Sequence, residues 1–111
     1  MAFYDITPVR LGQATMINSY ATIYTAPVGT RAFVKDIDIV NTSNAVAYIY
    51  VSLVNSGNAA ANNSIFFNNA IPAYTTMQWC GAQILNGGGT IQVRATPANT
   101  CTITVSGAEA V

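Results

Sequence analysis

The chain has 111 residues and a mean hydropathy of +0.35, and only 7 % of its residues are charged, against roughly 25 % in an ordinary soluble domain. Its formal net charge is zero, which argues against nucleic acid and anionic membranes as partners because both select clustered Lys and Arg. It contains no histidine, so the commonest general base of enzymes is missing.

Apolar and polar residues alternate with a period of two, which predicts β-strands rather than helices. In chain order, strands are expected over residues 3–10, 20–26, 31–41, 46–55, 64–67, 74–80, 90–96 and 101–106. Short strands separated by turns rich in Asn, Gly, Ser and Pro are typical of an all-β fold. We therefore predict a single antiparallel β-sandwich of about seven or eight strands, with jelly-roll or immunoglobulin-like topology.

The first strand differs from the rest because Pro8 excludes it from the centre of a sheet. We expect residues 1–19 to form an N-terminal arm and residues 20–111 to form the sandwich domain. Phe3, Tyr4 and Ile6 put large apolar groups on this arm, which indicates that it contacts a neighbouring molecule.

The alternation also predicts which face of each strand is buried. In residues 31–41, Ile37 and Ile39 share one face, and Asp36 and Asp38 share the other. The central core is expected to consist of Ile49, Val51, Leu53, Trp79 and Val93. The alternation fails around Lys35, where either a β-bulge shifts the register or the lysine turns outward at the rim.

The turns are predicted from residue types that favour turn conformations. Residues 41–44 and 97–99 are expected to close hairpins, and residues 86–89 to form a flexible glycine turn. Residues 56–63 are expected to form a loop in which residues 59–61 could make one helical turn.

No constellation in the sequence indicates catalysis. Asp36 and Asp38 could hold a divalent cation, but a solvated strand face paired with Arg31 and Lys35 explains them more simply. The glycine run at 86–89 lacks the lysine and the following helix of a phosphate loop. We expect no catalytic residue, no cofactor-binding residue, no metal site and no cofactor, and we expect that the protein is not an enzyme.

The two cysteines are expected to remain unbridged. No secretory signal opens the sequence, so Cys80 and Cys101 are interpreted as two small buried apolar residues.

Four tyrosines are candidates for an interface. Tyr48 and Tyr50 point away from the core face of their strand, and Tyr20 and Tyr24 alternate similarly. Tyrosine is favoured at protein interfaces because it buries a large area and keeps a polar tip. Ordinary cross-strand pairing and a platform for carbohydrate remain as alternatives.

Several stretches resemble small virion proteins of tailed bacteriophages. The similar segments are residues 23–29 (IYTAPVG), 32–37 (AFVKDI) and 41–43 (NTS), followed by Trp79, residues 85–91 and residues 104–109. The resemblance covers about residues 20 to 109 and rests on features of strands and turns. It implies a structural role on the particle and carries over no catalytic residue.

The resemblance and the sparse charge lead to the same functional expectation, because a free monomer normally keeps a charged surface of mixed sign. We expect a bacteriophage virion structural protein, assembled in the host cytoplasm, that serves as a capsid decoration or cement protein. The alternative is a tail, neck or head-fibre accessory protein, including a glycan-binding module. The expected partners are the major capsid protein or tail and neck proteins, together with further copies of the chain in a homo-oligomer such as a trimer, and neither nucleic acid nor membrane.

Overall fold

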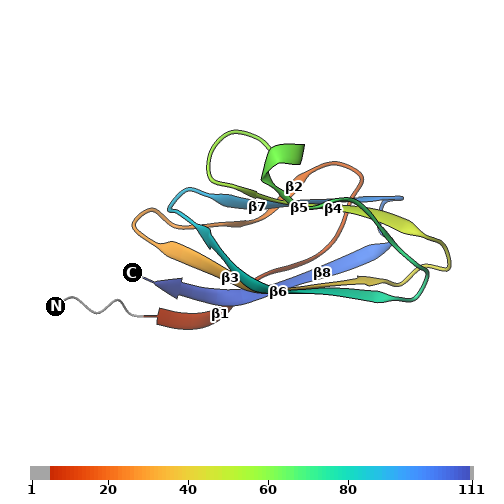
Figure 1. Cartoon of the computed structure of the whole chain (residues 1–111), viewed down its shortest axis with the longest axis horizontal. Coiled ribbons are helices and arrows are strands. Elements are labelled where there is room, and N and C mark those ends of the chain that lie inside the picture. Colours follow the sequence, from red (N-terminus) through yellow and green to blue (C-terminus); the bar gives the residue numbers. More distant parts are fainter. Residues whose placement is uncertain (1–5, 111) are drawn as a thin grey trace.

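A computed structural model describes residues 6–110 and shows two packed antiparallel sheets (Figure 1). The eight strands are β1 (Ile6–Thr15), β2 (Ala21–Thr25), β3 (Arg31–Asn41), β4 (Ala47–Val54), β5 (Ser64–Ile71), β6 (Thr76–Leu85), β7 (Thr90–Thr96) and β8 (Cys101–Ala110). A short 3-10 helix at Ala61–Asn63 precedes β5, close to the predicted helical turn. Within the described residues, no helix has the length and apolar character needed to cross a bilayer. The predicted all-β sandwich is confirmed.

The strand order decides between the two predicted topologies. One sheet has the order β1-β8-β3-β6 and the other β2-β7-β4-β5. The antiparallel partners within these sheets include β1 with β8, β2 with β7, β3 with β6 and β4 with β5. In this nested pairing the first strand pairs with the last, the second with the seventh, and so on inward. This is the jelly-roll topology and not the immunoglobulin arrangement.

The predicted hairpins at 41–44 and 97–99 are wrong. β3 and β4 lie in different sheets, as do β7 and β8, so both turns carry the chain across the sandwich. The first of these turns is fixed by Asn41, which is buried. Its Nδ2 donates to the carbonyl oxygens of Ala45 at 2.8 Å and Ile71 at 3.0 Å, and its Oδ1 accepts from the backbone N–H of Ser43 at 3.0 Å. Turn-forming residues mark where a strand ends, but they do not specify the sheet in which the next strand lies.

Residues 6–15 of the predicted arm form a strand of the sandwich itself. β1 pairs along its length with β8, from Ile6 opposite Ala110 to Thr15 opposite Thr102. Pro8 lies on this outer strand, as its missing N–H requires. Phe3 and Tyr4 lie outside the described residues, and the proposed contact of the arm with a neighbour stays a prediction.

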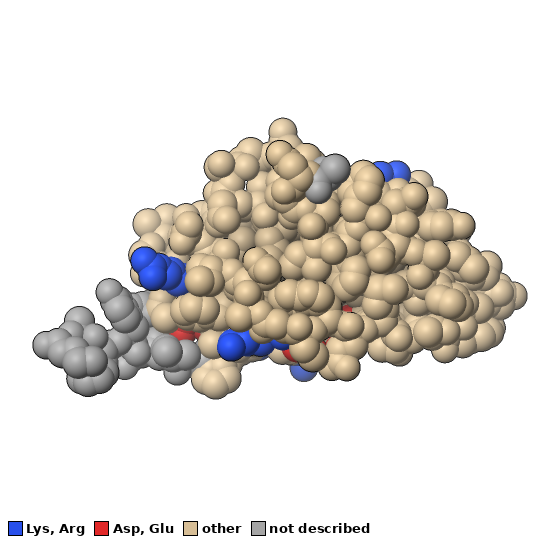
Figure 2. All heavy atoms as spheres, in the orientation of Figure 1, with Lys and Arg blue, Asp and Glu red and all other residues tan. Residues whose placement is uncertain are grey.

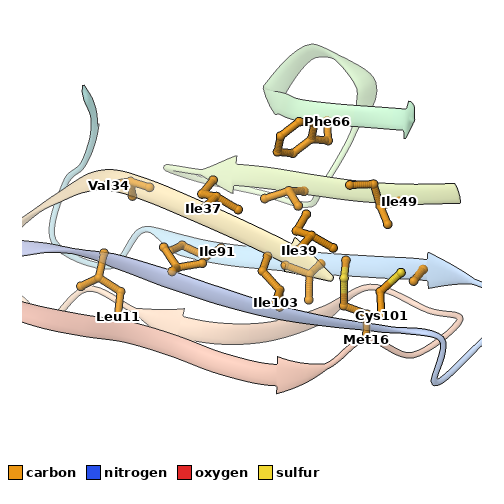
Figure 3. Close-up of a cluster of buried hydrophobic side chains, with 14 of the residues drawn as sticks. Leu11, Met16, Val34, Ile37, Ile39, Ile49, Phe66, Ile91, Cys101 and Ile103 are labelled. Atoms are coloured by element: carbon orange, nitrogen blue, oxygen red, sulfur yellow. The ribbon is translucent and has the colours of Figure 1, made fainter. Parts of the chain in front are cut away.

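The core fills the space between the two sheets (Figure 3). Ile37 and Ile39 of β3 face Ile49 and Val51 of β4, and all four side chains have no exposed area. Ile91, Val93, Ile103 and Val105 complete the centre with the same inward orientation. The predicted faces of β3 and β4 and the predicted burial of Val93 are confirmed, while Leu53 and Trp79 are only partly buried and pack against the cluster from its margin.

The irregularity at Lys35 is a β-bulge. The register of β3 shifts between Val34 and Asp36 against both β6 and β8. Against β8, Lys35 is the additional residue, and its side chain is exposed. Against β6 the extra residue belongs to β6, where Gly81 and Ala82 lie opposite Lys35. Gly107 lies opposite Val34, where a Cβ atom would collide with the carbonyl oxygen of Phe33. The bulge therefore requires glycine at this position of β8.

Candidate functional site

A cluster of aromatic side chains covers the outer side of the β2-β7-β4-β5 sheet. We call this surface the aromatic face, and it consists of Tyr20, Tyr48, Tyr50, Phe67 and Arg94. The ring centroids of Tyr50 and Phe67 are 5.3 Å apart, and those of Tyr50 and Tyr20 are 6.2 Å apart, both in edge-to-face geometry. Tyr48 and Phe67 are 43 % and 52 % exposed. Edge-to-face packing holds the rings of Tyr20, Tyr50 and Phe67 against one another.

Arg94 stacks on one ring of the aromatic face. It lies opposite Tyr50 across the β4–β7 ladder, and its Cζ is 4.8 Å from the centroid of the Tyr50 ring. The Tyr50 hydroxyl donates to Oδ1 of Asn68 at 3.0 Å. Arg94 Nε is buried and has no hydrogen-bond partner among the described residues. The guanidinium group is therefore held by stacking on Tyr50 and not by a carboxylate.

The local sequence explains why these rings reach the surface. Ile49 and Val51 point into the core, so Tyr48 and Tyr50 point out by strand alternation. Phe66 is buried opposite Val51, and its neighbour Phe67 must therefore face outward. Tyr20, Tyr48 and Tyr50 were predicted from the sequence and Phe67 was not, although two consecutive phenylalanines in a regular strand place one ring on each face.

Tyr24 does not belong to this surface, and its predicted outward orientation is wrong. A register shift between Thr22 and Tyr24 places Tyr24 opposite the buried Ile91. The ring packs against the core from its margin, and its hydroxyl donates to the Glu109 carboxylate at 2.5 Å. Burial, followed by the hydrogen bond to Glu109 and the charge of that carboxylate, raises the pKa of Tyr24 well above its ordinary value of 10.0. Tyr24 thus connects β2 to β8 and serves the fold.

The remaining interface candidates lie at the start of the chain. Ile6 is the first residue of β1 and pairs with Ala110. Phe3 and Tyr4 precede the described residues, so the proposed interface role of all three remains a prediction.

The outer side of the opposite sheet carries a small polar cluster around Asp36. Its Oδ1 accepts from Gln78 Nε2 at 3.0 Å and from the Cys80 thiol at 3.3 Å. The hydrogen bond from Gln78, with smaller contributions from Asp38 and Cys80, lowers the pKa of Asp36. The hydrogen bond with Asp36, followed by partial burial and the charge of that carboxylate, raises the pKa of Asp38. No group of three or more His, Cys, Asp or Glu side chains among the described residues is arranged to hold a metal ion.

Cys80 does not lie in the core, where the sequence predicted it. Both cysteines are free, as predicted, but only Cys101 is buried and Cys80 is exposed. Cys80 follows the inward-facing Trp79 on β6, so alternation places its thiol on the outer side. Its hydrogen bond to the Asp36 carboxylate, with smaller contributions from burial and from the charges of both aspartates, raises the pKa of Cys80.

The glycine turn at residues 86–89 joins two strands, β6 and β7, and no helix follows it. Gly88 has a φ of 87°, which favours glycine, and its N–H donates to the Ala26 carbonyl at 2.8 Å. The turn thus packs against the β2–β3 connection.

Charge is distributed unequally between the two sheets. Arg94 is the single charged residue in the four strands β2, β7, β4 and β5. The four strands of the other sheet contain six, namely Arg10, Arg31, Lys35, Asp36, Asp38 and Glu109. Charged groups appear in only a few separate places in the view of Figure 2. The molecule therefore has one charged sheet and one nearly uncharged sheet that bears the aromatic face.

Comparison with known proteins gives no family. No protein-family model matches the sequence, and no curated protein matches it. One of the solved chains with a similar backbone comes from the structure of infectious bursal disease virus, Gx strain, with a TM-score of 0.45 and 8 % sequence identity. The match covers 98 % of this chain and 33 % of that chain, so the chain spans about a third of the length of the protein that it matches. A likeness at this identity and TM-score identifies neither a family nor a function.

Proposed function

We propose that the protein is a bacteriophage virion structural subunit that decorates and stabilises the capsid by binding the major capsid protein through its aromatic face. The unequal charge of the two sheets carries this proposal. A nearly uncharged sheet that exposes Tyr48 and Phe67 is suited to lie against a protein shell, and the sheet with six charged residues is suited to face solvent. Interface hot spots are enriched in tyrosine and arginine, which meet here at Tyr50 and Arg94.

The mechanism follows from the composition of this face. Contact with the shell would remove the exposed rings of Tyr48 and Phe67 from water, and each large side chain contributes roughly 1.5–3 kcal/mol when it is fully buried. A protein that binds the assembled shell but not its dissociated subunits stabilises the particle by mass action. No covalent or catalytic step is required.

The test compares virus particles with and without the protein. Particles that lack the chain should bind the purified protein in a sedimentation assay and should then resist heating better. Tyr48→Ser should weaken binding at least tenfold, and Tyr74→Ser is the matched control because Tyr74 is 73 % exposed but lies outside the aromatic face. Absence of the protein from purified particles, or equal binding of the two variants, would refute the proposal.

A second candidate function is glycan binding by a tail, neck or head-fibre protein. Sugars stack on the open side of an aromatic ring, and the exposed Tyr48 and Phe67 rings offer such sides. Tyr50 is a poorer platform because Arg94 already lies over its ring. A glycan-array signal that Tyr48→Ala abolishes would favour this function over capsid decoration.

A further inference from the structure

A hollow lies where the end of β4, the start of β5 and the end of β6 come together. Its volume is about 340 Å³, and the residues that line it include Leu53, Asn55, Asn62, Ile65 and Gln83. None of these residues belongs to the aromatic face. Binding sites for small molecules have volumes from about 300 Å³ upward, so the hollow has room for one small ligand.

Gln83 has an unusual position in this hollow. It lies opposite Val34 of β3 and two residues before Leu85, and both of these residues are fully buried. Residues opposite one another in a ladder, or two apart in a strand, share a face of the sheet. Gln83 therefore points to the side of the sheet that faces the core, yet it is exposed. The space between the two sheets is open to solvent at this point.

Two irregular places in the strands shape the hollow. Gly81 and Ala82, directly before Gln83, lie opposite a single residue of β3. In β5, Ile65 is the additional residue where the register shifts against β4. Ile65 and Leu53 both pack against the core from its margin, and they give the hollow an apolar floor. Bulges of this kind are frequent next to active sites, where they redirect side chains.

The rim of the hollow is fixed by hydrogen bonds within the loop that leads to β5. Asn63 Oδ1 accepts from the Ala60 N–H at 2.9 Å, and Asn63 Nδ2 donates to the Asn58 carbonyl at 3.0 Å. The Ser64 hydroxyl donates to the Ala60 carbonyl at 2.7 Å. These bonds hold the 3-10 helix against the start of β5, so the rim is formed before a ligand binds.

Three amide side chains at the rim retain free hydrogen-bonding groups. Asn62 and Gln83 make no side-chain hydrogen bond to any other residue that the structure describes. Asn55 accepts from the Asn86 N–H through Oδ1 at 3.1 Å, which leaves its Nδ2 free. A carboxamide offers both donors and acceptors. The described residues that line the hollow include no charged side chain.

We propose that this hollow binds a single unit of a neutral carbohydrate. A charged ligand would lose its hydration here without gaining a counter-charge, and a wholly apolar ligand would cover the amides without bonding to them. A sugar ring has hydroxyl groups around its edge that donate and accept, and C–H groups on its faces that pack on Leu53 and Ile65. The small volume fits one sugar ring better than an extended peptide. The proposal does not depend on attachment to a capsid.

NMR spectroscopy of the isotope-labelled full-length protein tests the site. The probes are the methyl glycosides of glucose, galactose, mannose and N-acetylglucosamine, each added in a titration. At least one of them should shift the side-chain amide signals of Asn55, Asn62 and Gln83 in a saturable manner. The dissociation constant should be about 1–10 mM, because an open hollow covers only part of the ligand.

Gln83→Ala removes one of the three amides and should weaken binding roughly five- to tenfold. Gln78→Ala is the matched control, because Gln78 has the same side chain on the same strand but lies on the outer side, beside Asp36. Both positions are exposed, so both variants should keep the circular dichroism spectrum of the wild type. The methyl glycoside of glucuronic acid, which carries a charge, should bind at least about threefold more weakly than that of glucose.

The possible results separate this site from the alternatives. The proposal is overturned if no glycoside shifts the three amide signals at about 0.1 M, or if the two variants bind equally well. Shifts confined to Tyr48 and Phe67 would place the sugar on the aromatic face and would also overturn it. A blocked alanine dipeptide that binds the hollow more tightly than every glycoside would make it a peptide site. None of these measurements involves particles, so the test of capsid attachment remains separate.

Discussion

Val51 and Val28 are the same residue type in opposite surroundings. Val51 has no exposed area and packs between the sheets, whereas Val28 is 94 % exposed in the turn after β2. Removing two methyl groups from a packed core costs the transfer free energy plus the free energy of the cavity that remains. The same truncation in a solvated turn leaves no cavity.

Val51→Ala should therefore lower the free energy of unfolding by roughly 1–3 kcal/mol, measured by urea denaturation. Val28→Ala is the matched control and should change the unfolding midpoint very little. Equal effects of the two substitutions would mean that the core does not lie where β4 places it.

Tyr24 gives a prediction about pH. Its pKa in the folded protein is raised by burial and by Glu109, so the folded state keeps a proton that the unfolded state releases above pH 10.0. The contribution of Tyr24 to stability is thus complete below that pH and is lost as the pH rises further.

Wild-type stability should fall more steeply than that of Tyr24→Phe between about pH 10 and pH 12. The measurement is the urea midpoint at each pH, and Tyr74→Phe, at an exposed position, is the control that should follow the wild type. Parallel curves for wild type and Tyr24→Phe would show that the hydroxyl is not buried against Glu109.

At the scale of the element, the bulge in β3 determines which faces of the strand are buried. Val34 and Ile37 are both buried although three positions separate them, because Lys35 is the additional residue between two regular stretches. The bulge depends on Gly107 of β8, which allows the Phe33 carbonyl to approach.

Gly107→Ala should destabilise the protein by about 1–3 kcal/mol or more, since the collision is with backbone rather than with a flexible side chain. Thermal unfolding measures the effect. Ser106→Ala, at the adjacent position of β8, should remain close to wild type, and a Gly107→Ala variant as stable as this control would contradict the close approach of the two strands.

The strands were predictable because side-chain period is a local property. Ile37, Val51 and Val93 were assigned to buried faces from alternation alone, and the structure confirms all three. The irregularity at Lys35 was visible for the same reason, since an interrupted period appears in the sequence itself.

Features that depend on distant residues were not predictable in this way. The inward orientation of Tyr24 follows from a register shift against β7 and from Glu109, which is 85 positions away. The hairpin predicted at residues 41–44 failed because Asn41 ties its turn to Ile71, a contact between residues 30 positions apart. The stacking of Arg94 on Tyr50 likewise depends on how β4 and β7 lie beside one another.

At the scale of the whole molecule, the proposed attachment uses the sheet with the fewest charges. Ion pairs at an interface weaken as salt screens them, whereas contacts between apolar surfaces do not. Arg94 is the single charged residue of the strands beneath the aromatic face. Dissolved salt therefore has few charges to screen at this interface.

Binding of the protein to particles should therefore change by less than about threefold between roughly 0.05 M and 0.5 M salt. Co-sedimentation at several salt concentrations measures it, and Arg94→Gln, which removes the charge, should show the same flat response. A loss of affinity of a hundredfold or more would place the charged sheet, and not the aromatic face, at the interface.

The nested strand pairing also determines when the protein can fold during its own synthesis. β1 has a single partner strand, β8, and Ile6 meets Ala110. A ribosome that adds about 5–20 residues per second needs roughly 5–20 seconds to proceed from one to the other. Until then β1 has no strand to pair with, and the core faces of β2, β3 and β4 are not yet covered by β8. Nascent chains halted before residue 101 should accordingly be cut readily by protease, while released full-length chains should resist it.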